Sequence, residues 1–177
     1  KLGFDYVDLY LIHWPVPSRD LYVDTWRALE RLYADGRVRA IGVSNFHVPH
    51  LQRLFDETDV VPAVNQIELH PGLPQNELRA FHEEHGIVTE SWSPLARGRI
   101  ADEPALDRIA AKHGKTPGQV TIRWHLQLGA VVIPKSSSIE RVRGNFDVFD
   151  FELDGDDLAA IDALDDGYRT GPHPDAM

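Results

Sequence analysis

Cysteine is absent from the 177 residues, which excludes disulfides, thiolate metal sites and a cysteine nucleophile within them. No apolar run is long enough to cross a membrane as a helix, and no charged-then-apolar leader opens the sequence. Basic residues are scarce, because 18 lysines and arginines are set against 28 acidic residues and the formal net charge is −10. A nucleic-acid binder needs a basic surface. We therefore expect a cytoplasmic protein with neither nucleic acid nor a membrane as partner.

Methionine is nearly absent too. The single one is Met177, the last residue, and the sequence opens at Lys1 in an apparently helical or loop segment. A natural start normally supplies an initiator methionine. We therefore expect these residues to be part of a longer chain.

Short β-type runs alternate with longer segments whose apolar residues recur at helical spacing. The predicted strands cover residues 6–12, 38–43, 63–69, 87–92 and 130–134. The predicted helices cover residues 24–34, 50–55, 77–84, 104–113, 117–128, 139–145 and 156–164. Asn76 is predicted to cap the third helix, and Thr116 with Pro117 to open the fifth. Such alternation indicates parallel strands with crossover helices, in an open doubly wound sheet or a closed barrel.

Doubly wound sheets that bind dinucleotides usually carry Gly-x-Gly-x-x-Gly after a strand, and no predicted strand here is followed by it. This absence favours the barrel. A (β/α)8 TIM barrel usually needs eight strands and about 250 residues. The 177 residues are therefore predicted to form a single α/β domain, residues 1–177, with about the last five βα units of an N-terminally truncated barrel. Ligands would bind at the carboxyl ends of its strands.

Polar and aromatic residues accompany the first three predicted strands. His13 and Trp14 follow the first strand, Ser44 and Asn45 follow the second, and Gln66 lies in the third. Each position also has a structural alternative. Histidine packs in cores, serine and asparagine cap helices or form turns, and a buried amide needs some hydrogen-bond partner.

The last two strands end in residues that suit a nucleotide. Trp92 offers a flat surface for stacking, and a core position is its structural alternative. Lys135 and Arg141 bring two positive charges to Ser136 and a predicted helix N-terminus. Free N–H groups, hydroxyls and two bases together suit a phosphate group. The alternative there is a capped helix with two solvated bases.

Five short motifs occur in a fixed order: HWP at residues 13–15, GVSNF at 42–46, NQ at 65–66, SWSPL at 91–95 and IPKS at 133–136. Together they resemble the aldo-keto reductase family, and the resemblance extends over essentially the whole chain. The segment 135–145 resembles the cofactor signature of that family. Trp92 and the tail at 171–175 are similar to the bacterial branch that includes the 2,5-diketo-D-gluconic acid reductases.

The resemblance implies a (β/α)8-barrel enzyme, usually monomeric and without a metal, that reduces aldehydes or ketones by hydride transfer from NADPH. Small aldehydes, diketones and keto-sugar acids all remain open as substrates. His13 would be the catalytic histidine that orients the carbonyl, and Trp14 would contact the substrate. Lys135, Ser136 and Arg141 would bind the 2′-phosphate, which favours NADPH over NADH. The implied cofactor-binding residues are Ser44, Asn45, Gln66, Trp92, Ser93, Leu95, Arg97, Lys135, Ser136, Arg141 and Asn145.

Catalysis in this family depends on Asp, Tyr, Lys and His, of which His13 alone has a counterpart here. The tyrosine, its pKa tuned by the lysine and the histidine, protonates the developing alkoxide. None of the tyrosines present lies in the family's tyrosine context: Tyr6, Tyr10, Tyr22, Tyr33 and Tyr168. We therefore expect the 177 residues alone to be inactive. Loss of three strands would also expose two sheet edges and the apolar barrel interior.

Two other functions remain open. A metal-dependent barrel hydrolase or isomerase is one, with Glu68 and His70 on one strand face as ligands, although the segment 135–145 has no role in it. The remaining histidine pairs are expected on solvated helix surfaces: His47 with His50, and His82 with His85. The other function is an NADPH-binding regulatory protein of the same fold, which would bind the cofactor without turnover.

Overall fold

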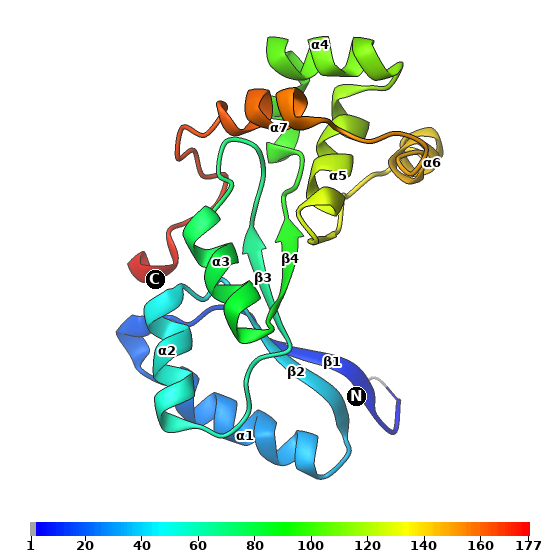
Figure 1. The fold of residues 1–177 in the computed structure, drawn as a ribbon. Coiled ribbons are helices and arrows are strands. Elements are labelled where there is room, and N and C mark those ends of the chain that lie inside the picture. The colour runs from blue at the N-terminus through cyan, green and yellow to red at the C-terminus, as the bar shows by residue number, and fades with distance from the viewer. Residues whose placement is uncertain (1–2) are drawn as a thin grey trace. The chain divides into compact units, whose positions relative to one another are not determined.

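The computed structural model describes residues 3–177, whose elements are labelled in Figure 1. The strands are β1 (Val7–Ile12), β2 (Val38–Ser44), β3 (Val64–Glu68), β4 (Val88–Trp92) and β5 (Val131–Val132). The α-helices are α1 (Tyr22–Ala34), α2 (Val48–Glu57), α3 (Asn76–His85), α4 (Pro104–His113), α5 (Pro117–Gln127), α6 (Ile139–Phe146) and α7 (Gly155–Asp162). The 3₁₀ helices are η1 (Pro17–Arg19), η2 (Ala96–Asp102) and η3 (Pro174–Ala176). No helix among these residues is long and apolar enough to span a membrane.

The strands form one sheet in the order β1-β2-β3-β4-β5. β1 pairs with β2, β2 with β3 and β4 with β5, each pair in parallel. Parallel neighbours require a crossover connection, which the intervening helices supply. The predicted α/β class with consecutive parallel βα units is therefore confirmed. β5 is shorter than the predicted run 130–134, because Pro134 has no N–H to donate to a strand ladder.

The described residues group into two compact units. Unit 1 contains residues 3–67, 76–89 and 172–177, and unit 2 contains residues 68–75 and 90–171. The division between them passes through β3 and β4. The single domain expected over residues 1–177 stays a prediction.

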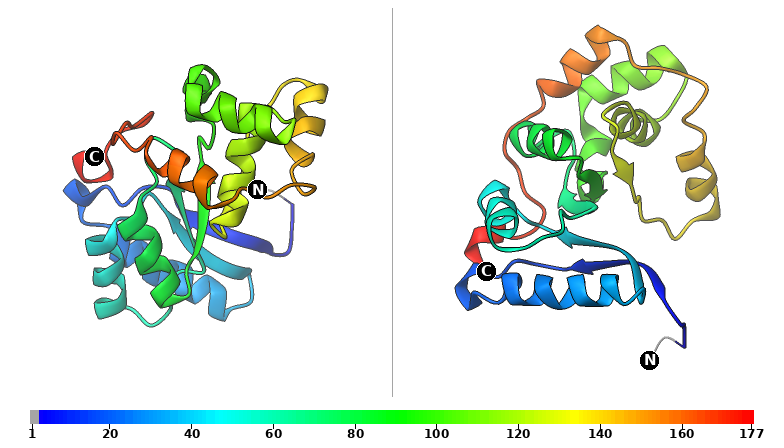
Figure 2. Two further views of the ribbon diagram at one scale, coloured as in Figure 1. Left: turned by 45° about the horizontal axis from the view of Figure 1, so that its top comes forward. Right: turned by 60° about the horizontal axis from the view of Figure 1, so that its bottom comes forward.

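In unit 1, α1 packs along β1 and β2 and against α2 (Figure 2). Trp26 and Leu29 of α1 are buried, as are Leu51 and Leu54 of α2. The Trp26 indole also donates a hydrogen bond of 3.0 Å to Val60 O. Each fully buried leucine contributes about 1.5–3 kcal/mol. Hydrophobic burial on these two helices therefore supports the strands that carry the candidate site.

Gly42 lies where β2 approaches β3 most closely. A Cβ at this position would lie 2.6 Å from Val64 O and 2.7 Å from Leu11 Cδ2. A backbone oxygen in a sheet cannot move aside without disturbing the strand, so glycine alone fits here. The close approach brings Ser44 into register with Gln66 at the carboxyl ends of the two strands.

In unit 2, α5 packs against β5, α4 and α6, and α4 packs against α7. The predicted start of α5 is confirmed, because Thr116 caps the helix and forms a capping box with Gln119. Gly114 ends α4 with φ 65°, a left-handed conformation that glycine adopts without strain. Leu106 of α4 and Trp124 of α5 are fully buried in the core of this unit.

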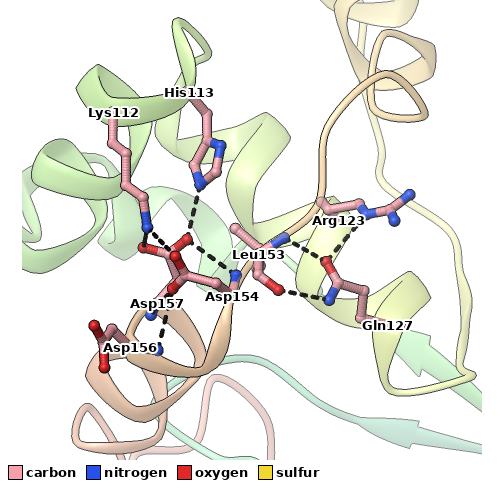
Figure 3. Close-up of polar contacts among 8 residues, drawn as sticks. All are labelled: Lys112, His113, Arg123, Gln127, Leu153, Asp154, Asp156 and Asp157. Carbon is pink, nitrogen blue, oxygen red and sulfur yellow. Dashed lines mark hydrogen bonds and ion pairs between the residues drawn. The ribbon is translucent and has the colours of Figure 1, made fainter.

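Polar contacts fix the segment that leads into α7, as Figure 3 shows. The Leu153 N–H donates to Gln127 Oε1 at 2.8 Å, and Gln127 Nε2 donates to Leu153 O at 3.0 Å. At the start of α7, Lys112 donates to Asp154 at 2.6 Å and to Asp157 at 2.8 Å. These contacts tie the N-terminus of α7 to the ends of α4 and α5.

One local prediction is wrong. Asn76 is the first residue of α3 rather than its cap, and its amide oxygen accepts a hydrogen bond from Arg79 Nη1 at 2.9 Å. Leu9 and Tyr10 of β1 are 38% and 49% exposed, which fits the uncovered sheet edge and barrel interior expected of a truncated barrel. Within residues 3–177, β1 pairs with β2 alone and forms one edge of the sheet.

The expected solvated surface is also wrong for two histidines. His50 is 7% exposed and His82 is 1% exposed. His82 lies between Asn65 Nδ2 at 2.9 Å and Thr89 Oγ1 at 2.8 Å, and His50 Nδ1 accepts the His47 N–H at 3.1 Å. Both rings find hydrogen-bond partners inside unit 1, which is what allows a polar side chain to be buried.

Candidate functional site

In unit 1 the structure brings together five predicted residues at the ends of β1, β2 and β3. The Ser44 hydroxyl donates to Gln66 O at 2.8 Å, and the Asn45 N–H donates to the same oxygen at 2.9 Å. Asn45 Nδ2 donates to His13 O and to Ser44 Oγ, both at 3.0 Å. The ring of Trp14 lies 6.1 Å from the exposed ring of His13, measured between centroids. These contacts fix the backbone around all of the expected unit 1 site residues.

Asn45 holds this group in place with a strained backbone. Its φ is 63°, in the left-handed region that asparagine tolerates better than most residues. Such a conformation costs about 1–3 kcal/mol and persists only where surrounding contacts enforce it. Asn45 is 4% exposed and Ser44 is 1% exposed. Burial and three hydrogen bonds thus enforce the geometry, and strain of this kind is typical of functional sites.

Asn65 lies on the opposite face of β3 and has a structural role. Its Nδ2 donates to Phe46 O at 2.8 Å and its Oδ1 accepts the Phe46 N–H at 3.4 Å. It is fully buried and also contacts His82. The side chain therefore ties the loop after β2 to β3. Gln66, one residue later, is half-buried on the other face, as strand alternation predicts.

In unit 2 the loop after β4 is tightly wound. Ser93, Ala96 and Arg97 have φ values of 49°, 46° and 53°. Three non-glycine residues in the left-handed region within five positions are uncommon, and such residues cluster at functional sites. Trp92 and Leu95 are half-buried, whereas Arg97 is exposed. The predicted residues of this loop thus lie on a strained segment that leads into η2.

The tail of unit 2 lies against Trp92. A Cβ at Gly171 would be 2.6 Å from Trp92 Cη2, so glycine is required there. The buried Glu68 carboxylate accepts the N–H groups of Thr170 at 2.5 Å and Gly171 at 3.3 Å, and His70 Nε2 lies 3.2 Å away. Burial alone would raise the pKa of Glu68, but these hydrogen bonds outweigh burial and hold the pKa below its ordinary value.

Glu68 and His70 therefore anchor the tail, because both carboxylate oxygens already accept hydrogen bonds. Both residues are at most 1% exposed. A carboxylate that binds a metal ion must direct a lone pair of its oxygens at the ion. In this arrangement the carboxylate of the pair considered as metal ligands from the sequence accepts hydrogen bonds instead.

The start of α6 gathers hydroxyls and positive charge. Ser138 caps the helix, and Ser136 Oγ accepts the Ser138 N–H at 3.2 Å and Arg141 Nε at 3.4 Å. Lys135 and Arg141 are exposed. Within residues 3–177, neither of them forms an ion pair. Asn145, on the last turn of the helix, is half-buried.

Sequence reasoning missed two features. The anchoring role of Glu68 was signalled by a carboxylate inside an apolar strand, which needs a partner when it is buried. The second feature is a group formed by His47, His173 and Asp175, whose possible ligand atoms lie within 4.8 Å of one another. Nothing in the sequence signalled this group, because it depends on where the last residues of the chain pack.

Comparison with known proteins gives consistent results. The model of the aldo/keto reductase family matches residues 1–166. An aldo-keto reductase of Mycobacterium sp. (strain KMS) is 59% identical over 174 residues, which cover 98% of this chain and 63% of that protein. Methylglyoxal reductase DkgA of Escherichia coli (strain K12) is 54% identical over 177 residues, 99% of this chain and 64% of that protein. The crystal structure of a mutant of Gox0644 in complex with NADPH has a TM-score of 0.94 at 53% identity, over 98% of this chain and 64% of that chain.

The chain thus spans 63–64% of the length of these three proteins. The likeness to a solved aldo-keto reductase-like structure at 53% identity confirms the barrel fold class that the sequence predicted. The bacterial relatives named DkgA confirm the branch that was expected from Trp92 and the tail. With the family model matching 166 residues and relatives matching nearly the whole chain, this chain belongs to the aldo/keto reductase family.

Proposed function

We propose that this chain forms the nucleotide-binding part of an NADPH-dependent reductase that converts aldehydes and ketones to alcohols. The observation that carries the proposal is the start of α6, where Arg141 reaches Ser136 and Lys135 lies exposed beside them. The net charge of the chain is −10, yet these two cations have no carboxylate partner among residues 3–177. At a helix N-terminus such cations favour an anion. A 2′-phosphate is such an anion, so NADPH is preferred to NADH.

The nicotinamide end of the cofactor is assigned to the strand ends of unit 1. A carboxamide needs both donors and acceptors, and the polar side chains of Ser44, Asn45 and Gln66 include both. The buried, strained backbone at Asn45 keeps these groups from rearranging when the ligand arrives. Trp92 supplies an aromatic face for stacking. Ser93, Leu95, Arg97 and Asn145 complete the cofactor contacts.

When bound, the cofactor supplies the hydride for carbonyl reduction. The exposed imidazole of His13 would donate a hydrogen bond to the carbonyl oxygen and so orient it. Trp14, next to it, would contact the rest of the substrate. Relatives named methylglyoxal reductase support small aldehydes of that type as the first substrates to test, with diketones and keto-sugar acids after them.

The proton donor is the part of the reaction that these residues do not supply. None of the tyrosines of this chain lies in the family's context, so binding of NADPH without turnover is expected from residues 1–177 alone. The same behaviour in a protein that also carries the family's Asp, Tyr and Lys would instead favour a regulatory, cofactor-binding role. The two functions are therefore separated by adding those residues.

The experiment is a chimera. Residues 1–177 are joined to the part of the mycobacterial relative that this chain does not match, and NADPH oxidation with methylglyoxal, a diketone and a keto-sugar acid is followed at 340 nm. Turnover is expected from the chimera, and loss of turnover with retained NADPH binding is expected from its H13A variant. A folded chimera that binds NADPH and reduces none of the three carbonyl classes contradicts the proposed activity.

A further inference from the structure

A second group of side chains in unit 1 has the composition of a metal site. His47 directly precedes α2, and His173 directly precedes η3, which carries Asp175. One possible ligand atom from each residue lies within 4.8 Å of the others. Residues 47 and 173–175 are far apart in sequence, so their meeting results from the packing of the last six residues on unit 1.

One distance in this group equals the separation expected around a metal ion, and the others are longer. His47 Nδ1 lies 3.3 Å from Asp175 Oδ1, and His173 Nδ1 lies 3.8 Å from Asp175 Oδ2. The rings of His47 and His173 are 4.9 Å apart between centroids. Metal–ligand bonds of about 2.0–2.2 Å separate the atoms of a tetrahedral site by about 3.4 Å. The 4.8 Å limit on their separations exceeds this value by about 1.4 Å, and the His47 side chain is half-buried. The His47 side chain also accepts the His50 N–H in a capping box, and His173 Nδ1 accepts the Asp175 N–H at 3.3 Å. Side-chain rotations that exchange these capping hydrogen bonds for metal bonds would therefore close the site.

His50 is placed to hold the carboxylate. Its Nδ1 accepts the His47 N–H at 3.1 Å, so the proton of the neutral ring resides on Nε2. Nε2 lies 3.5 Å from Asp175 Oδ1, where it can donate to a carboxylate that only accepts. A buried group that orients a ligand in this way is the usual outer shell of a metal site. His50 is therefore a positioning residue rather than a fourth ligand.

We propose that His47, His173 and Asp175 bind one divalent transition-metal ion, with zinc as the ion that best suits the set. Two imidazole nitrogens and one carboxylate oxygen favour zinc, nickel or cobalt over magnesium and calcium, which prefer oxygen ligands alone. The side chains of His173 and Asp175 are 48% and 55% exposed, so solvent supplies the remaining ligand. The ion joins the last six residues to the N-terminus of α2. This site is separate from the reductase chemistry and does not depend on it.

The first test uses the 177-residue chain without a histidine tag, stripped of metal with a chelator. Zinc is titrated by calorimetry and cobalt by visible absorption, which reports nitrogen and oxygen coordination directly. One zinc ion per chain and saturable cobalt bands are expected. Absence of saturable binding by a chain with a folded circular dichroism spectrum overturns the proposal.

Variants decide whether the ion binds at this place. H50N is expected to weaken zinc binding about 10–100-fold, as loss of an outer-shell partner does, and H173A and D175A are expected to weaken it further. H85Q and E83Q change a histidine and an acid on α3 of the same unit and are expected to leave binding unchanged. The exposed positions of His173 and Asp175 allow both variants to fold. Zinc binding that survives H173A and D175A, or that falls equally in H85Q, overturns the assignment.

Discussion

Replacement of Asp157 by asparagine should destabilise unit 2 through one buried charge. The side chain of Asp157 is 5% exposed. It accepts hydrogen bonds from His113 Nε2 at 2.7 Å, from Lys112 Nζ at 2.8 Å and from the Asp154 N–H at 3.2 Å (Figure 3). A carboxylate accepts all three, whereas an asparagine amide has one oxygen and points its NH₂ group at a donor.

The magnitude follows from the contacts that are lost. Lys112 is about half exposed and retains its ion pair with Asp154 at 2.6 Å. Loss of its exposed contact with Asp157 therefore contributes little to the change in unfolding free energy. The bond from His113, 15% exposed, is charge-assisted, and such bonds contribute about 1.5–3 kcal/mol. D157N is therefore expected to lower the unfolding free energy by about 2 kcal/mol. For a chain of this size that corresponds to a fall in Tm of about 4–8 °C.

The same contact has a pH signature. Burial alone would raise the pKa of Asp157, but hydrogen bonds from Lys112 and His113 outweigh burial and hold the pKa below its ordinary value of 3.8. A carboxyl group with a lowered pKa in the folded state stabilises the fold fully above its unfolded pKa. That contribution is lost as the pH falls below about 5 towards the folded pKa. The unfolding free energy of D157N should therefore decrease less steeply with falling pH than that of the parent chain.

The assay is urea unfolding followed by circular dichroism, at pH 7 and at intervals down to pH 3. D156N is the matched control, because it removes the same charge from the same turn while the Asp156 side chain is exposed and points away from Lys112 and His113 (Figure 3). Equal stabilities of D156N and D157N at pH 7 would refute the reasoning. So would an acid profile of D157N as steep as that of the parent.

Two further predictions concern His82 in unit 1 and a comparison of two glycines, Gly42 and Gly144. Burial, with a smaller contribution from Arg79, lowers the pKa of His82 to about 4. In the unfolded chain this histidine is protonated near pH 6.5, so the unfolding free energy should fall by about 3 kcal/mol between pH 7 and pH 4. Urea unfolding of H82Q should lack that part of the decline. G42A should destabilise by about 1–3 kcal/mol or more because its Cβ would meet Val64 O at 2.6 Å. G144A, in α6 with nothing within 4 Å of a Cβ, should stabilise by about 0.5–1 kcal/mol, and thermal unfolding of the pair measures both effects.

The fold was predictable where its signals are local. The Thr116 cap marks the start of α5, and the structure uses it as predicted. Gly114, directly after the predicted helix 104–113, ends α4. The end of β5 was predicted too late in the sequence. The apolar run 130–134 indicated a strand through Pro134, although proline lacks the N–H that a strand ladder needs, and β5 covers Val131–Val132. The alternation of strands and helices could therefore be predicted without knowledge of tertiary packing.

Burial and the meeting of distant segments were not predictable in this way. His50 and His82 lie on helices whose spacing fits a solvated surface, yet both are buried with hydrogen-bond partners on other segments. The anchoring of Thr170 by Glu68 joins residues about a hundred positions apart. A shared site for His13, Ser44 and Gln66 was expected from a resemblance, because the residues alone left capping and core packing open as alternatives. Tertiary contacts decide each of these cases.

The measurement that tests the central claim most directly is titration of the folded 177-residue chain with NADPH and with NADH, followed by quenching of its four tryptophans. We expect saturable quenching that prefers NADPH, and K135A and R141A should each weaken NADPH binding about ten-fold, the equivalent of one charge-assisted hydrogen bond. R143A, an exposed arginine on the same helix, should leave binding unchanged. A folded chain that binds neither nucleotide, or that binds both equally with no effect of K135A and R141A, contradicts the assignment of the α6 N-terminus as the 2′-phosphate site.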